Sequence, residues 1–87
     1  MNNFPKSIKI KIFYEGNIDK ITGKKFEEAA VSEGIDFINM LYFITESYPE
    51  IKEKYPPGQL GLLLNKKPPK VDELLKDNDE IILRTRN

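Results

Sequence analysis

The side chains of this 87-residue chain that could do chemistry are carboxylates and amines. Cysteine and histidine are both absent, so the chain lacks a thiolate nucleophile, the commonest general base and the commonest metal ligands. Acidic residues stand close together at Glu27-Glu28, Asp72-Glu73 and Asp77/Asp79. None of these groups has the spacing of a metal-binding loop, and the last reads as part of a turn. We therefore expect no catalytic residue, no metal, no cofactor and no enzymatic activity of the chain by itself.

The charge balance argues against a polyanionic partner. Fourteen basic residues balance fourteen acidic ones, so the net charge is zero and nothing attracts the chain to nucleic acid over long range. Lys66, Lys67 and Lys70 could touch a phosphate locally, but in a neutral chain we interpret them as a solvated loop. No apolar run approaches the roughly 20 residues that cross a bilayer, and no secretory signal is evident. The sequence predicts a cytoplasmic protein that binds neither nucleic acid nor membrane.

The first predicted element is a half-buried strand over residues 6–14, in which side chains alternate between two faces. One face carries Ile8, Ile10 and Ile12, and the other carries Lys9, Lys11 and Phe13. After a turn at residues 15–17, a second and less regular strand is predicted over residues 24–31. Its pattern leaves open which face is buried, because Ala29 and Val31 share one side while Phe26 and Ala30 share the other.

A helix is predicted to begin at Phe37, with the Asp36 side chain as its cap, and to end before Pro49. Apolar residues recur at helical spacing and form one stripe: Phe37, Met40, Leu41, Ile44 and Tyr48. Ile38 and Tyr42 lie beside this stripe, and we interpret them as covering the edge of the core. One more helical turn is predicted over residues 50–55.

The remainder of the sequence predicts two strands and a connector. Residues 59–65 read as a third strand with Leu62 and Leu64 on one face and Leu63 on the other. A polar connector follows, with a short helical turn predicted around Leu74 and Leu75, a tight turn at residues 77–79 and a closing strand over residues 80–86. This order predicts a single α+β domain, residues 1–87, with one helix laid across a sheet.

Two segments, EGIDFINMLYFITESYPEIKE and LLLNKKPPKVDELLKDNDEIIL, resemble the small sulfur-carrier proteins MoaD and ThiS. Four features carry the resemblance, which spans residues 8–83: Gly34 before the helix, Tyr48-Pro49-Glu50 at its exit, the strand ending at Asn65, and the turn that leads into the last strand. The resemblance implies the ubiquitin-like β-grasp fold, a mixed four- to five-stranded sheet with one helix packed across it. The family usually has glycine in two turns where this chain has Asn65-Lys66 and Asn78. Asparagine is the best substitute where φ is positive.

In this family a C-terminal Gly-Gly is adenylated by a partner enzyme and converted to a thiocarboxylate. Here Asn87 stands where the glycine pair would begin, and its side chain would hinder close approach to a nucleotide. We therefore expect a MoaD/ThiS-like protein that works by binding other proteins, as a module or a small accessory subunit. The alternative is a sulfur carrier for molybdopterin, tungstopterin or thiamine biosynthesis whose terminus is altered or truncated.

The predicted binding site is the outward face of the sheet. If the isoleucines of the first strand face the helix, alternation turns Phe13, Leu63 and Ile82 outward. Outward positions on a sheet with one wet face are usually polar, so three apolar ones suggest a docking patch. Four cations are predicted at its edges: Lys9, Lys11, Arg84 and Arg86. The partner implied is another protein, such as an adenylating enzyme or a subunit of a cofactor synthase or oxidoreductase.

Overall fold

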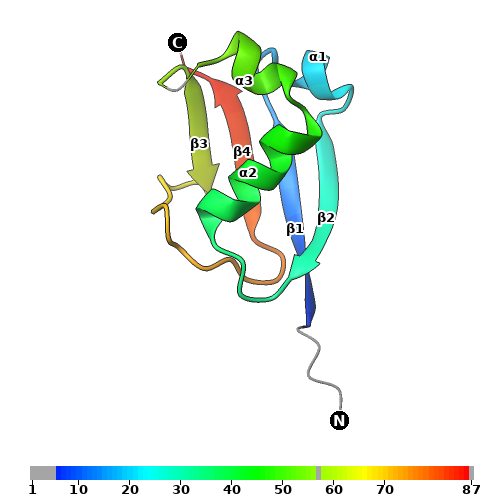
Figure 1. Cartoon of the computed structure of the whole chain (residues 1–87), viewed down its shortest axis with the longest axis vertical. Helices are drawn as coiled ribbons and strands as arrows, with labels where there is room; N and C mark the ends of the chain where they lie inside the picture. The colour runs from blue at the N-terminus through cyan, green and yellow to red at the C-terminus, as the bar shows by residue number, and fades with distance from the viewer. Residues whose placement is uncertain (1–5, 57, 87) are drawn as a thin grey trace.

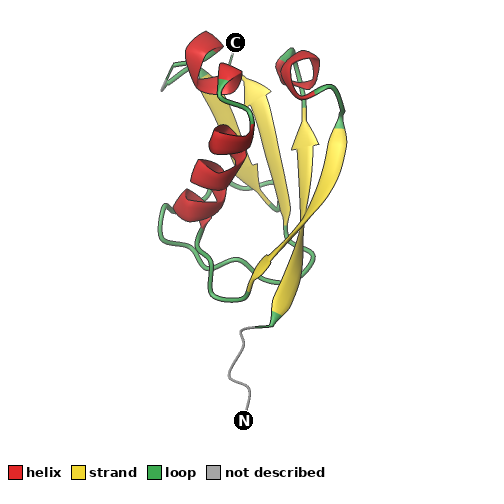
Figure 2. Cartoon of the chain, turned by 45° about the vertical axis from the view of Figure 1, so that its right-hand side comes forward, coloured by secondary structure: helices red, strands yellow, loops and turns green. Residues whose placement is uncertain are grey.

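Two layers, a four-stranded sheet and a helix lying across one of its faces, make up the protein (Figures 1 and 2). A computed structural model describes residues 6–56 and 58–86. The elements in chain order are β1 (Ser7–Tyr14), α1 (Ile18–Thr22), β2 (Phe26–Ser32), α2 (Phe37–Ser47), α3 (Glu50–Lys54), β3 (Leu60–Leu64) and β4 (Glu80–Thr85). Helix α2 crosses the sheet, and the short helices α1 and α3 lie at one end of it (Figure 1).

The sheet is mixed and has the order β2-β1-β4-β3. Strands β1 and β4, the first and last in the chain, pair in parallel at its centre, and the two outer pairs are antiparallel. The predicted α+β architecture is therefore confirmed, with four strands in the described part of the chain. Helix α1 was not predicted, because its five residues are too few to show a helical period and Asn17 makes no side-chain cap.

The core lies between the sheet and α2 and takes one face of every strand. Ile10, Ile12, Ile81 and Leu83 of the central strands are at most 2% exposed. Helices α1, α2 and α3 contribute further large buried side chains, namely Ile18, Phe37, Met40, Ile44 and Ile51. The alternation predicted for the first strand is confirmed, since Ile8 and Tyr14 are also buried on this face.

Helix α2 begins where predicted, because the backbone N–H groups of its first turn all find hydrogen-bond acceptors. The Asp36 carboxylate accepts a hydrogen bond of 3.0 Å from the backbone N–H of Asn39. The amides of Phe37 and Ile38 donate instead to backbone carbonyls of the 67–79 loop, at 2.8 and 3.0 Å. This loop therefore caps the helix, and the helical turn predicted around Leu74 and Leu75 is wrong. Its backbone is extended there and pairs with Asp36.

Two turns adopt the left-handed backbone that the comparison with glycine-containing turns predicted. Asn65, Lys66 and Asn78 have φ values of 51°, 69° and 71°. Asn65 also ties the turns together, since its side chain donates to Asp79 (3.0 Å) and accepts from the Glu80 amide (3.0 Å). The structural role predicted for the acidic residues of the last turn is confirmed: Asp77 accepts from the Lys9 amide, and Asp79 from the amide of Lys76.

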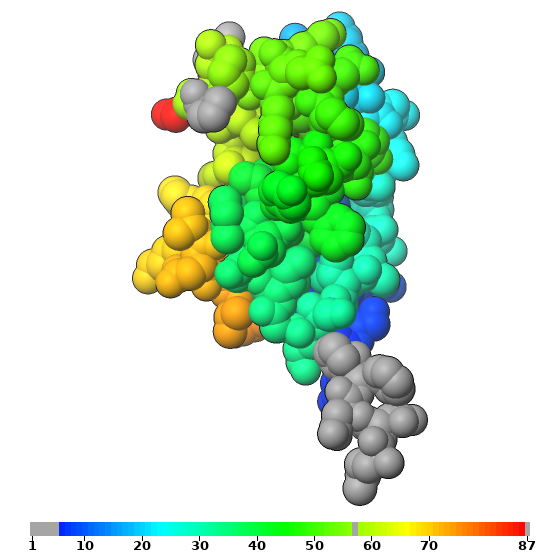
Figure 3. Space-filling view, viewed as in Figure 1, coloured from blue at the N-terminus to red at the C-terminus, as the bar shows by residue number. Residues whose placement is uncertain are grey.

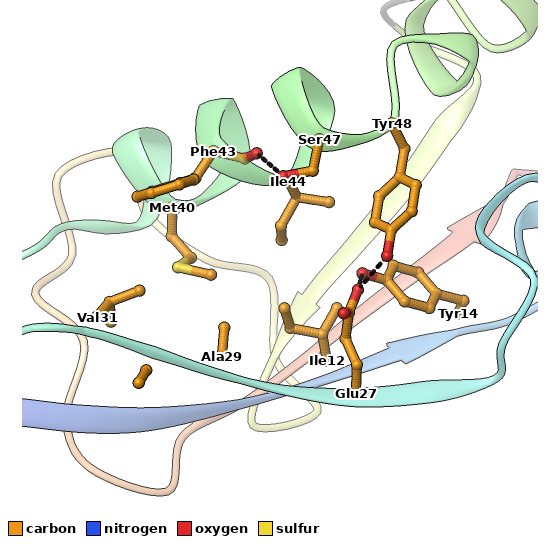
Figure 4. Close-up of a pocket in the computed structure, with 11 residues that line it drawn as sticks. Ile12, Tyr14, Glu27, Ala29, Val31, Met40, Phe43, Ile44, Ser47 and Tyr48 are labelled. Atoms are coloured by element: carbon orange, nitrogen blue, oxygen red, sulfur yellow. Dashed lines mark hydrogen bonds between the residues drawn. The ribbon is translucent and has the colours of Figure 1, made fainter.

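A carboxylate lies between the sheet and the end of α2, where Glu27 accepts hydrogen bonds from the hydroxyls of Tyr14 and Tyr48 (Figure 4). The two rings meet edge to face, with centroids 5.9 Å apart. Burial alone would raise the pKa of Glu27. The two hydroxyls and the Lys24 ammonium, 3.5 Å away, outweigh this and lower the pKa. Burial and the neighbouring carboxylate raise the pKa values of both tyrosines.

The lowered pKa of Glu27 predicts a pH dependence of stability. The folded state binds this proton more weakly than the unfolded chain, so the contribution is complete above the unfolded pKa of about 4.3 and is lost as the pH falls through the folded value. Glu27→Gln should reduce the free energy of unfolding at pH 7, and its difference from the wild type should shrink below about pH 4. Urea unfolding at a series of pH values measures this.

The matched control is Glu28→Gln on the opposite face of the same strand, where the carboxylate is 41% exposed and 3.9 Å from the Lys9 ammonium. Its effect should be small, because exposed pairs contribute about 0–1 kcal/mol. Equal losses at Glu27 and Glu28 would contradict the role given to the tyrosine hydroxyls.

The helix stripe should divide into a buried and a half-buried part. Ile44 is 4% exposed, and truncating it to alanine should cost about 2–5 kcal/mol. Leu41 is only partly buried, so Leu41→Ala should cost less than about 2 kcal/mol, although both belong to the predicted stripe. Denaturant unfolding of the two variants tests the inward face of α2, and a larger loss at Leu41 than at Ile44 would show that the face is misplaced.

Candidate protein-binding surface

One apolar residue from each strand lies on the face of the sheet that α2 leaves open. The register pairs Phe13 with Phe26, Phe13 with Ile82, and Leu63 with Ile82. These four side chains, which we call the outer row, therefore cross the whole sheet in the order Phe26, Phe13, Ile82, Leu63. The phenylalanine rings are tilted by 46° with centroids 5.0 Å apart.

The outward direction of the row follows from its buried neighbours. Ile12 and Tyr14 flank Phe13, and Ile81 and Leu83 flank Ile82, and all four flanking side chains are at most 2% exposed on the core side. Phe13, Leu63 and Ile82 are half-buried, and Phe26 is 42% exposed. The positions predicted to point outward do so, and the register brings them together.

Phe26 is the member of the row that the sequence did not assign. The pattern of β2 left its two faces undecided, because β2 is an edge strand with small residues on both sides. The signal that identifies Phe26 is its pairing with Phe13, which is a contact between strands and not a local pattern.

The four predicted cations lie on the two sides of the outer row, displaced from it along the strands. Lys11, two residues before Phe13 in β1, is paired with Glu28 in β2 and Glu80 in β4, so this side is mixed in charge. Lys9 lies farther along β1, with its ammonium 3.9 Å from the Glu28 carboxylate. The two glutamates were not foreseen, and they place acidic residues among the predicted cations on this side of the row.

Arginines border the other side of the row. A Cβ added to Gly61 would lie 3.0 Å from Cγ of Arg84 and 3.3 Å from Cγ of Arg86, so both stems pass close to the glycine backbone. Together with Leu63 and Pro68, they line an open hollow of about 610 Å³ beside the row. This side of the row combines apolar surface with positive charge.

The last described residues are fixed to the sheet. The backbone N–H of Arg86 donates to the Gln59 carbonyl at 2.9 Å, and its guanidinium to the Gly58 carbonyl at 3.4 Å. The site predicted at Asn87 lies outside the described residues. Any group carried by the chain end would therefore have to extend beyond Arg86.

Other chemical sites are not evident in the described ranges. Residues 6–56 and 58–86 contain no group of three or more acidic side chains that could hold a metal ion. Within the same residues, no helix is long and apolar enough to cross a membrane. Lys66, Lys67 and Lys70 are exposed around the turn after β3.

Comparison with known proteins gives no match to a protein-family model or to a curated protein sequence. Solved structures do match. A Pyrococcus furiosus protein described as molybdopterin converting factor, subunit 1, has a TM-score of 0.83 and 23% identity, over 93% of this chain and 100% of that one. Small archaeal modifier protein 1 of Haloferax volcanii has a TM-score of 0.79 and 12% identity, over 91% and 96%. The Methanosarcina acetivorans small archaeal modifier protein 1 gives 0.73 and 21%, over 92% and 94%.

These similarities cover nearly the whole of each protein, but every sequence identity is below 25%. They establish the architecture, in agreement with the two-layer arrangement and strand order described above. The chain has the MoaD-like, ubiquitin-like β-grasp fold.

Proposed function

We propose that this protein is a non-enzymatic β-grasp module that binds a partner protein through the outer row and the charged residues on its two sides. The observation that carries the proposal is the alignment of Phe26, Phe13, Ile82 and Leu63 across all four strands. On a sheet with one wet face these positions would ordinarily be polar. A contiguous apolar row bordered by charge is typical of a surface that another protein covers.

The composition of the row suits an interface. Aromatic side chains and arginine are enriched at the centres of protein interfaces, and the row contributes Phe13 and Phe26 beside Arg84 and Arg86. Rigid strands hold these side chains, so little conformational entropy is lost when a partner docks. The mixed charges around Lys11 would select the orientation of the partner more than its affinity.

The partner we propose is a larger protein with a cytoplasmic role, such as an adenylating enzyme or a subunit of a cofactor synthase or oxidoreductase. Support comes from the fold shared with a protein described as one subunit of a molybdopterin converting factor. The net charge of zero supports a protein partner over nucleic acid.

The second candidate is a sulfur carrier for molybdopterin, tungstopterin or thiamine biosynthesis, favoured by the same shared fold. A carrier terminus must reach into the site of an activating enzyme. The chain is hydrogen-bonded to the sheet as far as Arg86, so the residues up to Arg86 would not make that approach.

A charge placed in the outer row should separate binding from stability. Leu63→Glu and Phe26→Glu should each reduce partner capture about tenfold or more, because a carboxylate would be buried against the partner without a counter-charge. Both positions face solvent in the free protein, so the free energy of unfolding should change far less than for a core substitution. Capture from native lysate with mass-spectrometric identification, alongside urea unfolding, measures both effects.

Phe43→Glu is the matched control, because Phe43 is 58% exposed on α2, on the other side of the sheet. Equal loss of capture in all three variants would contradict the proposed surface. Unfolding by Leu63→Glu with Phe26→Glu still binding normally would also contradict it.

The carrier alternative is tested at the chain end. Incubated with ATP and a MoaD- or ThiS-activating enzyme, the unmodified protein should gain neither an adenylate nor a thiocarboxylate by intact-mass analysis. The control is a variant with a few flexible residues and Gly-Gly added after Arg86, which the enzyme should accept if docking uses the outer row. A thiocarboxylate on the unmodified chain would replace the leading proposal with the carrier function.

A further inference from the structure

A second apolar surface lies on the helix side of the molecule, away from the outer row. Helices α2 and α3 and the edge strand β3 enclose a groove of about 470 Å³, lined mainly by Ile38, Leu41, Tyr42, Tyr55, Leu60 and Leu62. Ile38 and Tyr42 are 45% and 59% exposed, so they do not close the edge of the core as their spacing suggested. Figure 3 views the molecule from this side, with α2 in green and β3 to its left.

The floor of this groove is an open sheet edge. Among the described residues, strand β3 pairs with one strand, β4. The bonds from the Arg86 amide to Gln59 and from the Asn65 amide to Glu80 show which residues of β3 bond to β4. In this register the backbone N–H and C=O groups of Gly61 and Leu63 point toward β4. The backbone groups of Leu60 and Leu62 point away from β4, and the side chains of these two residues line the groove. Each therefore offers an N–H and a C=O beside an apolar surface.

The open edge ends at Leu64. Its N–H donates to the Lys67 carbonyl at 2.8 Å, and its C=O accepts from the Lys67 N–H at 3.0 Å. The turn after β3 therefore blocks further pairing. The open edge offers the backbone groups of two residues, Leu60 and Leu62. A short extended segment fits this edge better than a long strand.

The charges along the edge select the occupant. Among the described residues, the charged lining of the groove is Lys52, and that of the hollow on the other face of β3 is Arg84 and Arg86. The ammonium of Lys52 lies 5.4 Å from the centroid of the Tyr42 ring, within the mouth of the groove. A second copy of this chain would bring the same cations together across the edge, whereas carboxylates would be attracted from both sides.

We propose that this groove and the β3 edge bind a short, extended, acidic segment of a partner protein, which adds to the sheet as a fifth strand. Backbone bonds to Leu60 and Leu62 hold the segment, and alternate apolar side chains enter the groove. Carboxylates on the segment meet Lys52 on one side and the two arginines on the other. The groove and the backbone edge of β3 lie apart from the outer row, whereas the two arginines border both surfaces.

The probe is a ten-residue blocked peptide of alternating valine and glutamate, titrated into the ¹⁵N-labelled protein. We expect saturable shifts at the amides of Leu60 and Leu62 and slower hydrogen exchange of both. A peptide with lysine in place of glutamate should bind about tenfold or more weakly. Lys52→Glu should weaken binding of the glutamate peptide by a similar factor, while Lys54→Glu, on the same helix but outside the groove lining, should change it little.

Three results would overturn the proposal. The first is equal affinity of the protein for the glutamate and lysine peptides, or an equal change in affinity for the glutamate peptide in Lys52→Glu and Lys54→Glu. The second is a set of shifts centred on β2 or on the outer row with Leu60 and Leu62 unchanged. The third is concentration-dependent association of the free protein through Leu60 and Leu62, which would assign the edge to a second copy of the chain. Tyr42→Ala removes an exposed side chain of the groove lining without a change of charge, and it should also weaken binding of the glutamate peptide.

Discussion

The parallel pairing of β1 with β4 at the centre of the sheet determines which side chains are buried and which are exposed. Ile12 is paired with Ile81, and Tyr14 with Leu83, so the two strands bury the same face beneath α2. A slip of one residue would exchange the faces of a whole strand, which would bury charged residues and expose isoleucines. The same register places Phe13 beside Ile82 on the open face. The core and the proposed binding surface are therefore two consequences of one pairing.

Strand β3 takes part in both proposed surfaces because its neighbouring residues point in opposite directions. Leu63 belongs to the outer row, whereas Leu60 and Leu62 line the groove beside α2 and α3. Arg84 and Arg86 lie along the same end of the sheet, against Gly61. A larger partner could then cover the open face while an extended acidic segment occupies the edge.

Features that depend on neighbouring residues could be predicted from the sequence, and features that depend on distant contacts could not. The alternation in β1, the Asp36 cap and the left-handed turn at Asn78 were predicted because each rests on a few adjacent residues. The loop near Leu74 was assigned wrongly, since its backbone conformation is set by its bonds to the start of α2. Likewise, Phe26 joins the outer row only through its pairing with Phe13, and the exposure of Tyr42 depends on where β3 lies.

The most direct test of the central claim is methyl cross-saturation NMR of this protein bound to the partner that it captures. The account predicts that methyl groups of Leu63 and Ile82 lose intensity when the partner is saturated, while buried Ile10 and Ile44 do not. Intensity loss confined to the α2 side, with Leu63 and Ile82 unaffected, would contradict docking through the open face of the sheet.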